Sequence, residues 1–102
     1  MAREVYLATS TMPDTERYGL TAQMRRAAVS VASNIAEGHG RQSRTDYLRF
    51  LRMARGSLWE LSTQHELATT MKMIPERRET LEIMQETDRV LQGLIRSLEA
   101  QC

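Results

Sequence analysis

The chain has few of the residues that disulfides and tight turns require. Its 102 residues include one cysteine, two prolines, five glycines, one Trp, three Tyr and one Phe. A single cysteine, Cys102, excludes an intramolecular disulfide and suits a reducing compartment, and we expect it to be an exposed thiol without a role. No apolar run approaches the roughly 20 residues that span a bilayer, and no hydrophobic signal core is present. The sequence therefore predicts a cytoplasmic protein without a membrane partner.

The net charge is only +1, but charge is distributed unevenly along the chain. Residues 25–55 carry seven Arg against two acidic residues, whereas residues 59–102 carry eight acidic residues against five basic ones. The basic side chains are nearly all arginine, which binds carboxylates and phosphates through a planar, bidentate fork. This composition is compatible with nucleic-acid binding, but a genomic preference for Arg codons explains the excess of Arg over Lys equally well.

Apolar residues recur at helical spacing in four segments, and the absence of β-branched runs also favours an all-α chain. The predicted helices cover residues 2–11, 20–37, 44–73 and 75–102. Gly38 is expected in a left-handed conformation after the second helix, and Pro75 at the first position of the fourth. Because the connecting loops are short, the sequence predicts an antiparallel up-down-up-down four-helix bundle with a short first helix, in one domain over residues 1–102.

The third predicted helix is the longest and carries a continuous apolar seam. Its positions alternate three and four residues apart, as in a helix packed lengthwise against partners. The seam consists of Tyr47, Leu51, Ala54, Leu58, Leu61, His65 and Ala68. Gly56 interrupts this helix, which fits either a close approach of another helix or a harmless exposed position.

Five arginines cluster around the predicted second loop and the first half of the third helix. They are Arg41, Arg44, Arg49, Arg52 and Arg55. One interpretation is a face that contacts phosphates, with binding that depends on salt and little on sequence. The other is a solvated face whose charges pair with Glu37, Asp46 or Glu60, and the sequence favours neither.

Residue types that catalysis and metal binding need are scattered or lack partners. Glu37 has the chemistry of a general base, but no nucleophile or metal ligand accompanies it. His39 and His65 do not have the spacing of a metal motif, and His65 is expected at the edge of the core. There is also no glycine-rich phosphate loop. We therefore predict no enzymatic activity, no metal site and no cofactor.

Two stretches carry motifs in order and at consistent spacing. The first is Gln23-Met24-Arg25-Arg26-Ala27 with Ser30-Val31-Ala32-Ser33-Asn34-Ile35-Ala36-Glu37-Gly38, and the second is Phe50-Leu51-Arg52-Met53-Ala54-Arg55-Gly56-Ser57-Leu58-Trp59-Glu60-Leu61. They resemble the signature of a four-helix-bundle protein family first noticed in intervening sequences of bacterial large-subunit ribosomal RNA genes. The resemblance covers residues 13–74 and, more loosely, the last helix.

The resemblance implies a four-helix subunit, assembly into a homopentamer, a basic surface for RNA or DNA, and no enzymatic activity. Related proteins include the accessory variability determinant of diversity-generating retroelements, a barrel-like homopentamer that binds nucleic acid and a reverse transcriptase. A reverse transcriptase is therefore an implied partner. The ribosomal branch of the family has the same motifs, so a protein-binding scaffold without a nucleic-acid role is the alternative.

The resemblance also suggests that the two motifs face each other in the bundle. Asn34 and Glu37 lie one turn apart beside the apolar stripe of the second helix, and polar groups near a core need partners. We expect a structural polar network in which Glu37 pairs with Arg26 or Arg55, and in which Gly56 permits the close approach of the helices.

Overall fold

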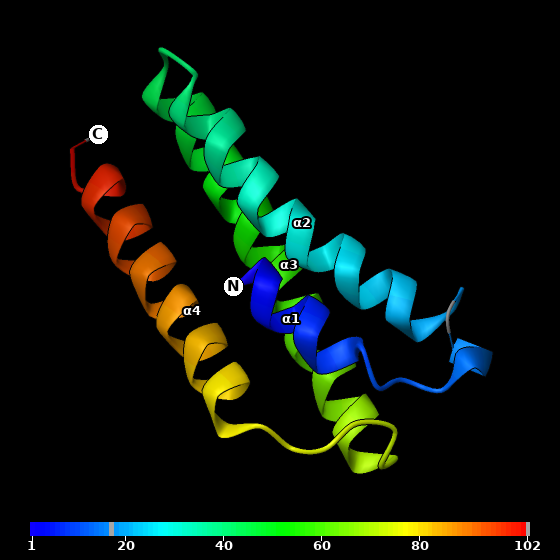
Figure 1. The fold of residues 1–102 in the computed structure, drawn as a ribbon. Coiled ribbons are helices and arrows are strands. Elements are labelled where there is room, and N and C mark those ends of the chain that lie inside the picture. The colour runs from blue at the N-terminus through cyan, green and yellow to red at the C-terminus, as the bar shows by residue number, and fades with distance from the viewer. Residues whose placement is uncertain (17, 102) are drawn as a thin grey trace.

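The computed structural model describes residues 1–16 and 18–101, and most of these residues are helical (Figure 1). The elements are α1 (Ala2–Thr9), the short 3-10 turn η1 (Asp14–Glu16), α2 (Leu20–His39), α3 (Arg44–Thr70) and α4 (Arg78–Glu99). No strand occurs among the described residues, so the all-α prediction is confirmed. Cys102, expected to be an exposed thiol, lies outside the described part of the chain.

The four helices run in alternating directions, which confirms the predicted up-down-up-down bundle with a short first helix (Figure 1). The bundle is elongated, with extents of 46 × 24 × 17 Å. α2 and α3 share the most extensive interface, whereas α1 packs mainly on α2 and touches α4. In Figure 1, α1 lies in front of α3 and reaches along only part of the length of α2 and α4. No helix of the described chain has the length and apolar character to cross a membrane.

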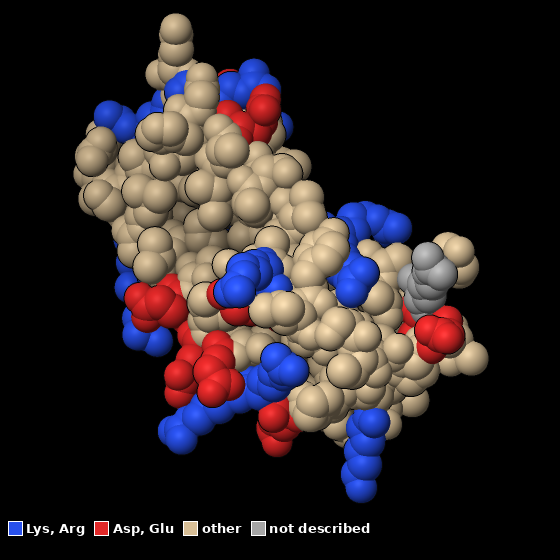
Figure 2. All heavy atoms as spheres, viewed as in Figure 1, with Lys and Arg blue, Asp and Glu red and all other residues tan. Residues whose placement is uncertain are grey.

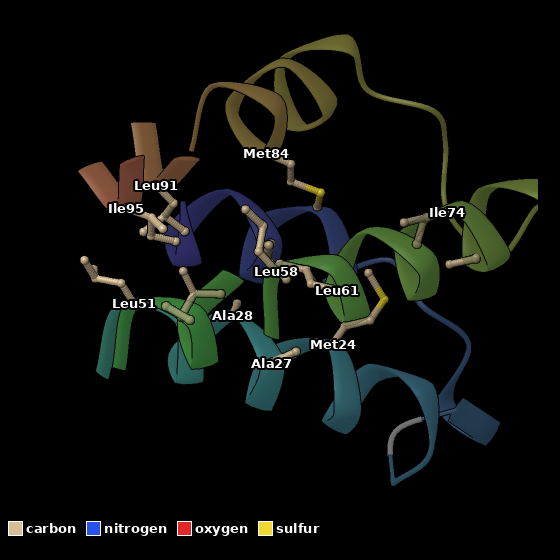
Figure 3. Packing of buried hydrophobic residues seen from close by; sticks show 14 of the residues in the cluster. Met24, Ala27, Ala28, Leu51, Leu58, Leu61, Ile74, Met84, Leu91 and Ile95 are labelled. Carbon is tan, nitrogen blue, oxygen red and sulfur yellow. The ribbon is translucent and has the colours of Figure 1, made fainter. Parts of the chain in front are cut away.

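The core is formed by aliphatic side chains from all four helices. Figure 3 shows Leu58 and Leu61 of α3 between the side chains of α2 and those of α4. The labelled neighbours are Met24, Ala27 and Ala28 of α2 and Met84, Leu91 and Ile95 of α4. The predicted seam of α3 is confirmed, because all its residues are buried except Tyr47, which is half-buried. Small buried residues at Ala27 and Ala28 let α3 approach α2 closely.

An eight-residue helix is only marginally stable in isolation, so α1 depends on its contacts with α2. The Thr9 hydroxyl donates to the Val5 carbonyl oxygen at 2.8 Å and accepts a hydrogen bond from Nε of Arg25 at 2.9 Å. The Arg25 guanidinium also lies 4.6 Å from the centre of the Tyr6 ring. Arg25 therefore connects the end of α1 to α2.

Two predictions about helix ends are wrong. Gly38 lies inside α2, which continues to His39 and ends at Gly40, and no described glycine has a positive φ. Instead Lys72 is left-handed at φ 58°, and the Met73 amide donates to the Ala68 carbonyl at 2.9 Å, so α3 stops at Thr70. The chain after Lys72 then needs an extended segment to reach α4, so the helix begins at Arg78 and not at Pro75.

His65 is more deeply buried than the sequence predicts. It lies in the core at 4% exposure, and its Nε2 atom has no hydrogen-bond partner among the described residues. Burial lowers the pKa of the His65 imidazole from its usual value of 6.5, and the opposing attraction of Glu76 is the smaller effect. The folded bundle therefore holds this side chain in its neutral form.

Burial of His65 makes the stability of the bundle depend on pH. The unfolded chain binds a proton at this residue more readily than the folded chain, so stability is constant above about pH 6.5 and falls as the pH decreases below it. The slope is at most about 1.4 kcal/mol per pH unit for one proton. We expect His65→Leu to flatten this dependence in urea titrations between neutral pH and about pH 5.5. His39→Gln, at an exposed position, is the control, and an unchanged slope in His65→Leu would contradict the assignment.

Candidate nucleic-acid interface

The five predicted arginines gather at the end of the bundle where the α2–α3 loop meets the end of α4. Arg41 lies in the loop, and the other four are on the first three turns of α3. Figure 2 shows basic and acidic side chains beside one another at this upper end, where Figure 1 places the loop. The structure thus brings the predicted residues together, but with carboxylates among them.

Every arginine of this cluster has a partner within the chain. Arg41 pairs with Glu37, Arg49 with Asp46 at 3.6 Å, Arg52 with Glu99 at 3.2 Å, and Arg55 with Asp88 at 2.9 Å; Arg44 donates to the Gln101 carbonyl at 2.8 Å. Of the three carboxylates expected as partners, Glu37 and Asp46 take this role. Glu60 does not, since it accepts a hydrogen bond from Gln64. Exposed ion pairs of this kind contribute about 0–1 kcal/mol, so the arginines can exchange them for other anions.

Arg55 differs from the other four because its side chain is only 29% exposed, and its pair with Asp88 joins α3 to α4. Its guanidinium donates to Oδ1 of Asp88 and lies 4.8 Å from the centre of the Trp59 ring. Trp59 Nε1 donates to the same Asp88 oxygen at 3.3 Å. Asp88 thus holds both side chains of α3, and Arg55 has a structural role at this helix contact.

Gly38 has less space for a side chain than any other glycine of the chain. The sequence predicted the close approach of two helices at Gly56 instead. A Cβ atom built on Gly38 would lie 2.8 Å from Cβ of Phe50 and 3.0 Å from Cδ1 of Tyr47. Two guanidinium groups also lie near the centre of the Phe50 ring, that of Arg41 at 5.0 Å and that of Arg49 at 4.6 Å. The glycine that ends the first motif is therefore what lets the start of α3 pack against the end of α2.

The predicted polar network, in which Glu37 pairs with Arg26 or Arg55, does not form. Glu37 is exposed and pairs with Arg41, and Arg26 is exposed without an ion pair to another described residue. The residues point away from the α2–α3 interface because their positions on α2 lie opposite its buried stripe. A Cβ added to Gly56 would meet nothing within 4 Å, so this residue is not at a close helix approach.

A smaller polar contact joins the two motifs instead. The hydroxyl groups of Ser30 and Ser57 are 2.9 Å apart across the α2–α3 interface. Asn34 is oriented toward them, since its side-chain amide donates to the Ser30 carbonyl at 2.9 Å and to the Ser30 hydroxyl at 3.1 Å. The two motifs therefore do face each other, through short hydroxyl side chains that the sequence analysis did not single out. The presence of a serine in each motif is the feature of the sequence that indicates this contact.

Comparison with known proteins agrees with the motifs. The profile of the family described as 23S rRNA-intervening sequence protein matches residues 1–96. The chain belongs to this family. The match is wider than the resemblance suggested, because it includes α1 and most of α4. A comparison with curated proteins gives no match.

The description of the 23S rRNA-intervening sequence protein family names no reaction. Within the described residues, no three His, Cys, Asp or Glu side chains lie close enough to hold a metal ion. The features that stand out on the surface are the arginine cluster and the exposed apolar side chains on the four helices.

Proposed function

We propose that this member of the 23S rRNA-intervening sequence protein family is a non-catalytic protein that binds RNA or DNA through Arg41, Arg44, Arg49 and Arg52, with Arg55 positioned behind them. The observation that supports this is the gathering of these side chains at one end of the bundle, where three of the pairs are exposed. A phosphate replaces an exposed carboxylate at little cost, because both ion pairs form in water.

Charge reversal at the exposed arginines tests this function. The triple variant Arg41→Glu, Arg49→Glu, Arg52→Glu is expected to lose nucleic-acid binding at low salt. Each phosphate contact that is removed should reduce the slope of log K against log salt concentration by about 1. Arg55 is left intact, because its reversal would place a carboxylate against Asp88 inside the α3–α4 contact.

A matched triple variant on α4 controls for net charge. Arg77→Glu, Arg78→Glu and Arg89→Glu change the charge equally, at exposed positions on α4 or just before it. We expect this variant to bind nearly as well as the original chain, measured by fluorescence anisotropy with labelled RNA and DNA. Equal losses in the two variants would show that only net charge matters, and absent binding by the folded original chain would overturn the proposal.

A second candidate function is a protein-binding scaffold, and exposed apolar side chains favour it. Eight of them are more than 40% exposed on the described helices, and Trp59 and Val90 are 58% exposed. They are Tyr6, Leu7, Val29, Met53, Trp59, Leu67, Leu81 and Val90. Figure 2 shows a broad surface without charged side chains between the two charged zones. Binding to a protein partner that survives nuclease treatment and the triple reversal would favour this function.

Exposed apolar side chains also support assembly into a homo-oligomer, which we propose to be a pentamer, with a reverse transcriptase as a further partner. α1 does not extend along the upper half of α2 and α4, and Ile35 and Leu94 on these two helices are only partly buried (Figure 1). A second copy that covers such side chains gains the free energy of burying them, about 25 cal/mol per Å². A monomer in sedimentation equilibrium would contradict the assembly, and failure to copurify with a co-expressed reverse transcriptase would contradict that partnership.

A further inference from the structure

A cavity of about 370 Å³ opens on the surface between α3 and α4, inside the arginine cluster. It is lined by Arg52, Arg55, Gly56, Trp59, Ile95 and Glu99. Gly56 creates much of this space, since nothing lies within 4 Å of the position that a Cβ atom would occupy. Ile95 supplies an apolar floor at 8% exposure. The cavity thus combines an apolar interior with a cationic rim.

Trp59 is held at the side of this cavity although it is 58% exposed. Exposed side chains usually rotate freely, but two contacts fix this one, the Arg55 guanidinium over the ring and the hydrogen bond from Nε1 to Asp88. A fixed and exposed indole next to a guanidinium is a surface on which a planar ring can stack without further loss of side-chain freedom. Nucleobases stack on such aromatic and guanidinium planes.

We infer that this cavity binds one unpaired base of a single-stranded nucleic acid. The inference rests on the proposed function and names its substrate class. The base enters between Arg52 and Trp59 and stacks against the Arg55–Trp59 pair, while Arg52 exchanges Glu99 for the adjoining phosphate. Bases in a duplex are paired and stacked on their neighbours, so they cannot enter, and a duplex contacts only the exposed arginines.

Filling the cavity without disturbing the fold tests this inference. Gly56→Leu places a side chain beside Arg52 and Trp59, one turn away on either side, where the base would lie. The helix should not suffer, because the position is open and glycine is the poorer helix former. Gly93→Leu on α4 is the matched control, since an added Cβ there also meets nothing within 4 Å.

We expect Gly56→Leu to weaken the binding of single-stranded nucleic acid and to leave the binding of a duplex nearly unchanged. One stacked base contributes about 1–3 kcal/mol, so Gly56→Leu should weaken binding of a short unstructured oligonucleotide by about 5- to 150-fold. Binding of a duplex of the same length should change less than about twofold, and Gly93→Leu should change neither. Equal affinity of Gly56→Leu and the original chain for the single strand would overturn the inference while leaving the proposed function intact.

A second readout does not depend on a mutation. Trp59 is the only tryptophan of the chain, so its fluorescence reports on this cavity alone. Saturation with the single strand should quench this emission, and the duplex should leave it nearly unchanged. Binding of the single strand without quenching would also overturn the inference. If neither nucleic acid binds at low salt, the proposed function fails, and the inference fails with it.

Discussion

Gly38→Ala is expected to lower the free energy of unfolding by about 1–3 kcal/mol, although alanine is the better helix former. The added Cβ would lie 2.8 Å from Cβ of Phe50, an atom fixed by its own helix backbone. Relief therefore requires α2 and α3 to move apart, which loosens the packing of Tyr47 and of buried Phe50. Urea titration followed by circular dichroism measures the change.

The other helical glycines supply the control for this substitution. Gly56→Ala and Gly93→Ala should each raise the stability by about 0.5–1 kcal/mol, because the new methyl group meets no neighbour and only the helix propensity improves. The same chemical change is thus expected to have opposite signs at Gly38 and Gly56. A Gly38→Ala variant at least as stable as the original chain would disprove the close approach at the end of α2.

Asp88→Ala is expected to destabilise the bundle by about 1.5–3 kcal/mol, the range for hydrogen bonds to charged groups. The Asp88 carboxylate accepts from both Arg55 and Trp59, and both donors are on α3. Without it, a partly buried guanidinium loses its counter-charge at the contact between α3 and α4. The thermal midpoint should fall, and the tryptophan emission should change because its Nε1 contact is lost.

Glu86→Ala is a matched control for this effect, because it removes an acidic side chain two residues away on the same helix. Glu86 pairs with Arg89 at 2.8 Å, but both side chains are more than half exposed. We expect a change below about 0.5 kcal/mol. If the two substitutions destabilise equally, the Asp88 contact has no special role.

The helices and the core followed from the sequence because they depend on periodicity. The seam from Leu51 to Ala68 repeats at the spacing of a packed helix, so its buried face could be predicted without knowing the partner. The positions at which the helices end were harder to predict from the sequence. Lys72 takes a left-handed conformation that glycine usually adopts, and nothing in the neighbouring sequence predicts this conformation.

The pairing of polar side chains was the part that the sequence did not determine. Arg55 and Asp88 are separated by 33 residues, and their contact depends on the rotation and register of α3 against α4. The same holds for Arg52 and Glu99. Gly38 and Gly56 illustrate the limit, since both lie in motifs on adjacent helices and only the geometry shows which one faces a neighbour.

The interface between α2 and α3 also has a consequence for the order in which the chain folds. These helices are adjacent in sequence, joined by a loop of a few residues, and they share more contact than any other pair. Pairings between neighbouring segments form quickly because little loop entropy is lost. During synthesis, the hairpin of residues 20–70 is complete before α4 is made, so α4 docks its apolar face onto a surface that already exists.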